Sequence, residues 1–148
     1  MDMKRGKNNI MNQIKGFFDE YSFLSNFYEC TVEYNGLFYK SSEAAYQAQK
    51  CPFIANKFTN ISASESKKLG RHVQIRCDWE DVKLSIMKEI VTNKFKQNPD
   101  LLEKLISTGD AELSEENYWG DKFWGTVDGI GENHLGKILM EVRNKLKK

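Results

Sequence analysis

Apolar residues recur every three or four positions in several stretches of the chain, which predicts amphipathic helices. The longest of these stretches runs from about Trp79 to Phe95. Ahead of it, Ser62 and Glu65 have the spacing of a capping box, and Gly70 is placed to close the helix that the box would begin. The pattern therefore predicts two consecutive helices in the middle of the chain.

Short alternating stretches predict a small amount of sheet. Residues 31–34 and 37–39 flank Asn35-Gly36, the dipeptide that best supplies the positive φ angles of a type I′ hairpin turn. Residues 112–114 form a third short stretch of strand character. Because helices dominate and do not alternate with strands, we expect the α+β class, as a single compact and mostly helical domain with a small β-hairpin or sheet.

Three further helices complete the prediction. Ser41 or Ser42 is placed to cap a short helix that must end near Pro52. Pro99 occupies the favoured first position of another helix, which stops at Gly109. The last helix begins near Asn133, and its apolar face consists of Leu135, Ile138, Leu139, Val142 and Leu146.

Length and composition set the class of protein. The 148 residues suffice for one domain with its own core, and the polar residues 1–14 predict a flexible segment ahead of a domain over 15–148. The net charge of +1 argues against binding nucleic acid through bulk charge. The three cysteines lack metal-site spacing, and no signal peptide or long apolar run is present. We therefore expect a reduced cytoplasmic protein without structural zinc or a membrane partner.

Lys83 departs from the pattern of its helix. With Trp79 as the origin and about 100° per residue, Lys83 falls at about 40°, inside the apolar stripe. Its ammonium group must either reach water along its stem or lose its proton more readily than usual. In the second case Lys83 is a nucleophile for carbonyl-like carbons.

Two carboxylates each allow a structural and a chemical interpretation. Glu43 opens a helix directly after a strand, so it is either a partner of the helix dipole or a general acid or base held by the helix. Asp121 lies between Trp119 and Trp124, so it is either a turn residue that caps its own backbone or a carboxylate whose pKa is set by apolar surroundings.

Phosphate-binding candidates lie elsewhere in the chain. The glycine-rich residues 129–136 enter the last helix, where exposed N–H groups would favour phosphate, although Asn133 can equally be a simple N-cap. Arg71 and Arg76 can each grip a phosphate or take part in surface salt bridges. The two histidines have no partners that would predict a catalytic triad or a metal site.

Several motifs occur in the order found in one family. They are Ser25-Asn26-Phe27-Tyr28, Ser42-Glu43-Ala44-Ala45-Tyr46-Gln47-Ala48-Gln49-Lys50, Gly70-Arg71 with Arg76, Asp78-Trp79-Glu80 with Lys83, Asp121 before Trp124-Gly125, and Gly131-x-Asn133-x-Leu135-Gly136. Together these motifs, over residues 17–146, resemble the YbiA-like N-glycosidases of the NADAR (NAD and ADP-ribose linked) superfamily. Ala44-Ala45 departs from the pattern, since many relatives carry a bulkier residue there.

The resemblance implies an enzyme that hydrolyses the N-glycosidic bond of a phosphorylated riboside, such as a ribosylamino-pyrimidine phosphate of early riboflavin synthesis. Two alternatives remain: a hydrolase of ADP-ribosylated guanine in nucleic acid or nucleoside, and a non-catalytic ADP-ribose or NAD-binding module. No cofactor and no metal are implied. The expected catalytic residues are Glu43, Lys83 and Asp121, and the expected substrate-binding residues are Ser25, Asn26, Phe27, Arg71, Trp79, Trp124, Gly131 and Asn133.

Overall fold

A computed structural model describes residues 12–147 of the protein. These residues group into two compact units, one formed by residues 12–25 with 103–147 and the other by residues 26–102. The predicted flexible segment, residues 1–14, lies mostly outside the described residues.

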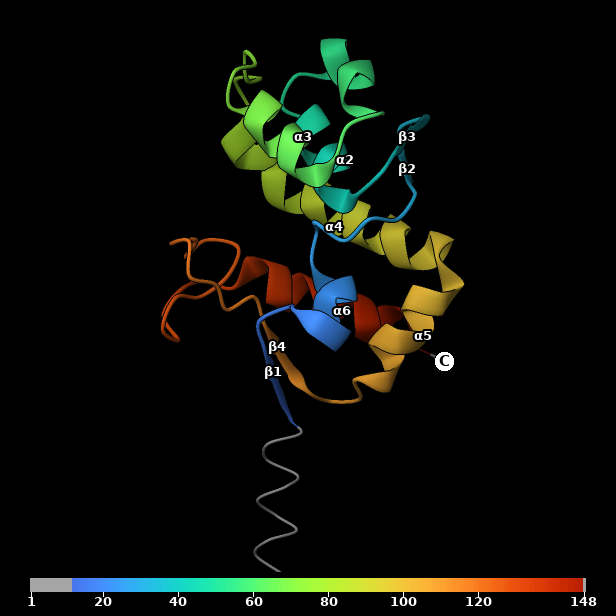
Figure 1. The fold of residues 1–148 in the computed structure, drawn as a ribbon, viewed down its shortest axis with the longest axis vertical. Helices are drawn as coiled ribbons and strands as arrows, with labels where there is room; N and C mark the ends of the chain where they lie inside the picture. Colours follow the sequence, from blue (N-terminus) through green and yellow to red (C-terminus); the bar gives the residue numbers. More distant parts are fainter. Residues whose placement is uncertain (1–11, 148) are drawn as a thin grey trace, which may run out of the picture. The chain divides into compact units, whose positions relative to one another are not determined.

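The unit of residues 26–102 begins with a β-hairpin (Figure 1). Strands β2 (Val32–Tyr34) and β3 (Leu37–Tyr39) pair antiparallel, with Val32 opposite Tyr39. Asn35 and Gly36 have φ values of 50° and 85°, as a type I′ turn requires. The predicted hairpin is confirmed.

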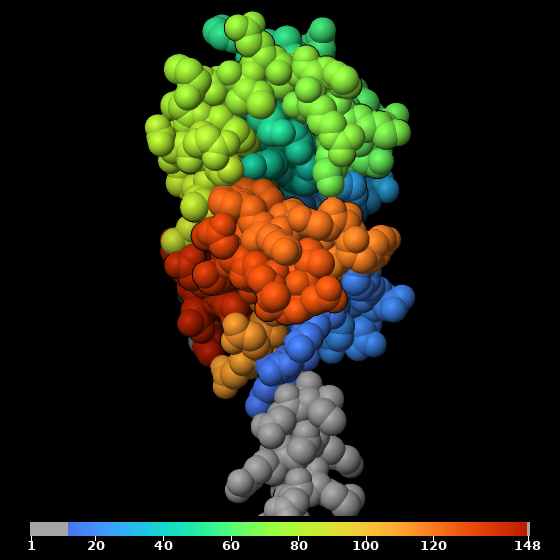
Figure 2. Space-filling model, turned by 90° about the vertical axis from the view of Figure 1, so that its left-hand side faces the viewer, coloured from blue at the N-terminus to red at the C-terminus, as the bar shows by residue number. Residues whose placement is uncertain are grey.

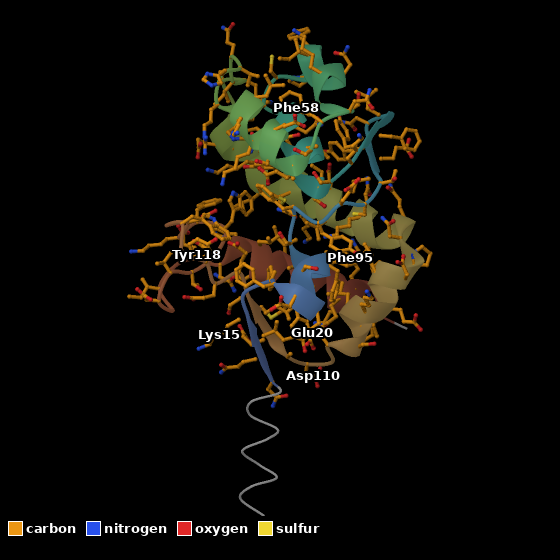
Figure 3. All side chains as sticks on the ribbon, viewed as in Figure 1. Lys15, Glu20, Phe58, Phe95, Asp110 and Tyr118 are labelled. Atoms are coloured by element: carbon orange, nitrogen blue, oxygen red, sulfur yellow. The ribbon has the colours of Figure 1, made fainter. Side chains whose placement is uncertain are left out.

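Helix α2 (Ser42–Ala48) follows the hairpin and is buried along its whole length. Ser41 is its cap, because the Ser41 hydroxyl accepts a hydrogen bond of 3.0 Å from the Ala44 N–H. The chain then forms a 3-10 helix that the sequence pattern did not predict, η2 (Pro52–Phe58). Phe58, labelled in Figure 3, is fully buried and anchors this helix.

Helix α3 (Ala63–Gly70) packs against α2 through small residues. The predicted capping box is present: the Ser62 hydroxyl accepts from the Glu65 N–H, and the Glu65 carboxylate accepts from the Ser62 N–H. The buried face of α3 consists of Ala63, Ser66 and Gly70. A Cβ atom on Gly70 would lie 2.0 Å from Oε1 of Gln47, so a larger residue there would have to displace the Gln47 amide.

Helix α4 (Trp79–Gln97) is the long helix that the apolar stripe predicts, extended by two residues. It packs against α2 and against the hairpin, where the Tyr34 hydroxyl donates to Glu89 over 2.5 Å and the Asn93 amide donates to the Glu33 carbonyl. Six apolar residues at three- and four-residue spacing define the predicted stripe: Trp79, Val82, Ile86, Met87, Ile90 and Val91. Five of them are buried, and Val82 is half-buried.

The second unit, residues 12–25 with 103–147, contains a parallel pair of strands. These are β1 (Gln13–Lys15) and β4 (Glu112–Ser114), which lie side by side in Figure 1. Strand β4 is confirmed. The prediction of a flexible terminus is wrong for Gln13 and Ile14, which belong to β1, and Ile14 is buried. Residues 13–15 form a strand because they pair with β4, which lies far along the chain, and a local pattern cannot reveal such pairing.

Three helices complete the structure. The 3-10 helix η1 (Asp19–Leu24) belongs to the second unit, and α5 (Pro99–Ser107) begins in one unit and ends in the other. The predicted stop of α5 is confirmed, since Gly109 follows it with a φ of 65°. Helix α6 (His134–Leu146) buries Leu135, Ile138, Leu139 and Val142 as predicted, while Leu146 is half-buried.

Lys94 on α4 is fully buried beside the rings of Phe95 and Tyr28, with its Nζ 5.1 Å and 5.8 Å from their centroids. Burial lowers the pKa of Lys94 from 10.5 to about 8, although the neighbouring Cys30 opposes this fall. Below pH 8 the folded protein therefore carries the whole penalty of a buried ammonium group. The penalty fades as the pH rises from 8 to 10.5, where the unfolded chain still binds the proton.

We expect Lys94→Met to raise the free energy of unfolding at pH 7 by about 2 kcal/mol, because the apolar side chain removes this penalty. The advantage of the variant over the wild type should narrow by about 1 kcal/mol between pH 7 and pH 9. Urea denaturation of both proteins at the two pH values measures the change. An advantage that is constant or grows with pH would contradict this account.

Candidate functional site

The predicted site residues fall into two groups, one in each unit. The unit of residues 26–102 carries Asn26, Phe27, Glu43, Arg71, Trp79 and Lys83, and the other unit carries Ser25, Asp121, Trp124, Gly131 and Asn133.

Glu43 lies in the first turn of α2 and is 8% exposed. Its backbone N–H donates to the Asn26 carbonyl over 3.0 Å, and its carboxylate oxygen Oε2 accepts a hydrogen bond of 2.7 Å from the Gln47 amide. A helix-dipole partner needs neither burial nor a side-chain donor. The geometry therefore favours a carboxylate held in one place by its helix over a simple partner of the helix dipole, the two interpretations that the sequence allows.

Lys83 lies on α4 with most of its side chain buried. Its side chain is 17% exposed and its Nζ lies 2.7 Å from the Glu80 carboxylate, whose side chain is 79% exposed. The stem thus follows the apolar stripe, and the ammonium group meets a carboxylate at the edge of the stripe. This is the anomalous position that the hydrophobic pattern indicates.

Lys50 lies just after α2 and interacts electrostatically with Glu43, with Lys83 and with further positive charges. It is half-buried, and its pKa is lowered by burial, against the opposing charge of Glu43. The positive charges of Lys83, Arg71 and Lys67 lower the pKa of Lys50 further. We call Lys50, Lys67, Arg71 and Lys83 the cation cluster; the charges of its other three members and of the buried Glu43 carboxylate all act on Lys50. Such a cluster is suited to an anionic group such as phosphate.

The two arginine candidates differ in their surroundings. The guanidinium group of Arg76 binds the Asp78 carboxylate through two hydrogen bonds, of 2.6 Å and 3.0 Å, which occupy its planar fork. Arg71 is exposed at the end of α3 and belongs to the cation cluster. Arg71 is therefore the better candidate for a phosphate contact, while Arg76 fixes the start of α4.

Trp79, Asn26 and Phe27 surround this region of α2. Trp79 is buried and packs on the ring of Tyr46 with centroids 5.1 Å apart, and its predicted contact with substrate stays a prediction. The Asn26 side chain donates to the sulfur of Met87 on α4. Phe27 is half-exposed and lies 5.7 Å from Nζ of Lys67. Figure 2 shows atoms of the α2 region (teal) between the green atoms of α3 and the segment after it.

In the other unit, four N–H groups at the start of α6 are hydrogen-bonded to backbone at the point where phosphate was expected. The N–H groups of residues 132–135 donate to the carbonyl oxygens of residues 122–125, over 2.7–3.1 Å. These four N–H groups are therefore not open to a phosphate, and phosphate binding by residues 129–136 stays a prediction. Glycine spacing indicates where a helix begins, but not which carbonyl groups reach it.

Asn133 and Gly131 maintain this loop. Asn133 has a left-handed φ of 53°, and its buried amide accepts from the Glu115 N–H and donates to the Leu113 carbonyl. Gly131 has a φ of 149°, and a Cβ atom there would lie 2.4 Å from the Gly125 carbonyl oxygen. Both residues have a structural reason for their identity. Their predicted contacts with substrate stay a prediction.

Asp121 caps the backbone of its own turn, which is one of the two interpretations that the sequence allows. Its Oδ1 accepts hydrogen bonds from the N–H groups of Phe123 (3.0 Å) and Trp124 (2.9 Å). The side chain of Asn117, which the sequence did not single out, bonds both backbone polar groups of Asp121. The carboxylate is half-buried, so this turn geometry is compatible with a second, chemical role.

The rings near Asp121 form a small cluster. Trp124 contacts Phe123 edge-on, with centroids 4.9 Å apart, and His134 lies 4.5 Å from Phe123. His134 also meets the Glu132 carboxylate at 3.0 Å. Ser25 lies at the end of η1, where its N–H donates to the Ser22 carbonyl. These contacts are all within the second unit.

Three residues of the first site group were missed by the sequence interpretation: Gln47, Lys50 and Lys67. Gln47 and Lys50 follow Glu43 by four and seven positions, so all three share one face of a helix. That spacing was a readable signal. Lys67 reaches the cluster from α3, and only the packing of α3 on α2 brings it there.

Within residues 12–147 no group of three or more His, Cys, Asp or Glu side chains is arranged to hold a metal ion. Over the same residues, none of the helices combines the length and the apolar character needed to cross a membrane.

Comparison with known proteins assigns the chain to a family. The NADAR domain matches residues 12–147, which include both units. A riboflavin biosynthesis protein from Vibrio vulnificus is 40% identical over 149 residues, covering 95% of this chain, but this chain spans only 40% of the Vibrio protein. An N-glycosidase from Nostoc punctiforme is 38% identical over 86% of each chain.

A solved structure agrees with this assignment. The NMR structure of Escherichia coli YbiA has a TM-score of 0.80 to this fold at 30% identity, covering 91% of this chain and 85% of that one. The Escherichia coli protein, named N-glycosidase YbiA, is 34% identical over 136 residues, which cover 86% of this chain and 83% of that one. The chain belongs to the NADAR family. The expected mostly helical α+β fold and the expectation of an N-glycosyl hydrolase are confirmed.

The two interpretations of Asp121 can be separated by one pair of variants. Asp121→Asn keeps an oxygen acceptor for the two N–H groups and removes the charge. If the carboxylate takes part in proton transfer, kcat should fall by about 100-fold or more, with an unchanged melting temperature. Asp121→Ala should in addition lose about 1–2 kcal/mol of stability. Turnover and thermal unfolding are the measurements, and full activity of Asp121→Asn would leave only the turn role.

Proposed function

We propose that the protein hydrolyses the N-glycosidic bond of a phosphorylated riboside, such as a ribosylamino-pyrimidine phosphate of early riboflavin synthesis. The observation that carries the proposal is the cation cluster beside Glu43, which pairs a site for phosphate with a fixed carboxylate. The riboflavin biosynthesis name of the Vibrio relative supports the choice of riboside.

The first mechanism uses Lys83 as a nucleophile. In the ring-opened sugar the anomeric carbon is joined to the departing nitrogen as an imine. The neutral amine of Lys83 adds to that carbon, and the nitrogen of the base accepts a proton and leaves as an amine. A Schiff base between Lys83 and the sugar remains. Water adds to it, releasing the sugar aldehyde and regenerating the lysine.

Glu43 or Asp121 would transfer the protons in this scheme. The rival mechanism is direct: Glu43 and Asp121 act as a glycosidase-like pair of acid and base, and Lys83 holds phosphate. The burial of the Lys83 stem and its contact with Glu80 are compatible with both mechanisms. In the covalent scheme the lysine must leave Glu80 and give up its proton before it attacks.

The substrate class is tested by turnover of three compounds: the ribosylamino-pyrimidine phosphate, the same riboside without phosphate, and ADP-ribosyl guanosine. We expect the phosphorylated riboside to give the highest kcat/KM, because phosphate is the group that the cation cluster recognises. Faster turnover of ADP-ribosyl guanosine would favour that alternative. Tight NAD binding without hydrolysis of any of the three would favour the non-catalytic module.

Lys50→Met tests whether the cation cluster recognises phosphate. It should raise KM for the phosphorylated riboside by about tenfold or more, the effect of one lost charge-assisted contact. For the riboside without phosphate the KM should change little. Equal effects on both substrates would show that Lys50 does not recognise phosphate.

Reduction with borohydride during turnover separates the two mechanisms. The covalent scheme predicts a reduced sugar adduct on Lys83, found by mass spectrometry, and a fall in kcat of at least about 100-fold for Lys83→Ala. Lys68→Ala, which removes an exposed lysine of α3, is the matched control and should retain the adduct. Near-normal turnover of Lys83→Ala would refute the covalent scheme and leave the direct one.

A further inference from the structure

Gln47 connects the proposed catalytic carboxylate to helix α3. It lies one turn after Glu43 on α2, is 5% exposed, and donates a hydrogen bond of 2.7 Å from Nε2 to the Glu43 carboxylate. On its other side the amide touches the backbone of α3, since a Cβ atom on Gly70 would lie 2.0 Å from Oε1 and 2.8 Å from Cδ of Gln47. The amide therefore fills the space between a carboxylate and a glycine.

The orientation of this amide follows from its partner. A carboxylate only accepts hydrogen bonds, so the NH₂ group must face Glu43 and the oxygen must face Gly70. Within residues 12–147 the Gln47 oxygen has no hydrogen-bond partner. A buried acceptor without a partner destabilises the folded state, and methionine would fill the same space without it. Stability therefore does not explain why glutamine occupies this position.

We propose that Gln47 is a positioning residue for Glu43, and that Gly70 provides the space its amide needs. The hydrogen bond keeps the carboxylate in one rotamer and favours its ionised form, which is the form that accepts a proton. This inference rests on the proposed role of Glu43 as the proton carrier of the N-glycosidase reaction.

The test is Gln47→Met, measured by kcat, KM, the pH profile and thermal unfolding with the phosphorylated riboside. We expect kcat to fall by about tenfold or more while KM changes little. The acidic limb of the pH profile should move to higher pH, because the carboxylate loses a donor that favours ionisation. The melting temperature should stay the same or rise, since the buried oxygen without a partner is gone.

Gly70→Ala tests the same inference from the opposite side. The added methyl group must displace the Gln47 amide, so this variant should reproduce the shifted pH profile although it removes no polar group. Gln49→Met is the matched control, because Gln49, the C-cap residue of α2, is equally buried but donates to the Ala45 carbonyl. That variant should keep the wild-type pH profile.

Each outcome decides one point. Wild-type kcat and pH profile in Gln47→Met, with an inactive Glu43→Gln, would overturn the positioning role and leave the proposed function intact. Activity that falls only together with the melting temperature would assign Gln47 to structure and also overturn the inference. Full activity of Glu43→Gln would instead refute the catalytic role of Glu43 itself.

Discussion

The close packing of α3 on α2 is the constraint on which the candidate site depends. Small side chains on the buried face of α3, with Gly70 at its end, allow the two helices to approach until a glutamine fills the remaining space. Because α2 is buried along its length, its polar residues are fixed by neighbours rather than by water. Glu43 acquires a single arrangement through this packing, and the same packing brings Lys67 and Arg71 of α3 toward Lys50.

Charge in this protein is organised locally. The whole chain is nearly neutral, with a formal net charge of +1, but in the unit of residues 26–102 the charges of three other cations and of Glu43 act on Lys50. Arg76 does not add to that positive charge freely, because its guanidinium group donates to both carboxylate oxygens of Asp78, through Nε and Nη2. Bulk composition thus excludes broad electrostatic attraction to nucleic acid, whereas a compact anionic group meets a concentrated field.

Features that arise from neighbouring residues could be read from the sequence. The Asn35-Gly36 turn, the Ser62 and Glu65 capping box, and the stripe of α4 with its misplaced lysine all follow from local chemistry. Strand β1 could not be predicted from the sequence, because it forms only through pairing with β4. The family resemblance proposed the site residues, but packing had to supply their surroundings.

The second unit shows how similar local signals can mislead. Glycines before α6 indicated a helix start, yet the carbonyl groups that bind its N–H groups lie in a separate turn. Asp121 could be placed in a turn by its residue type, but the bracing by Asn117 depends on a fold of the loop that no spacing rule describes. For these residues, sequence identified the position and the structure identified the partners.

We expect the start of α6 to exchange its amide hydrogens with solvent more slowly than most helix starts do. A helix usually leaves its first N–H groups open to water, and these exchange fast. In this protein the N–H groups of residues 132–135 are closed by the carbonyl groups of residues 122–125. Their exchange therefore requires the turn that contains Asp121 to separate from the helix. Turn and helix form one cooperative opening unit, and slow exchange at the first turn of α6 reports whether the Asp121 turn is closed.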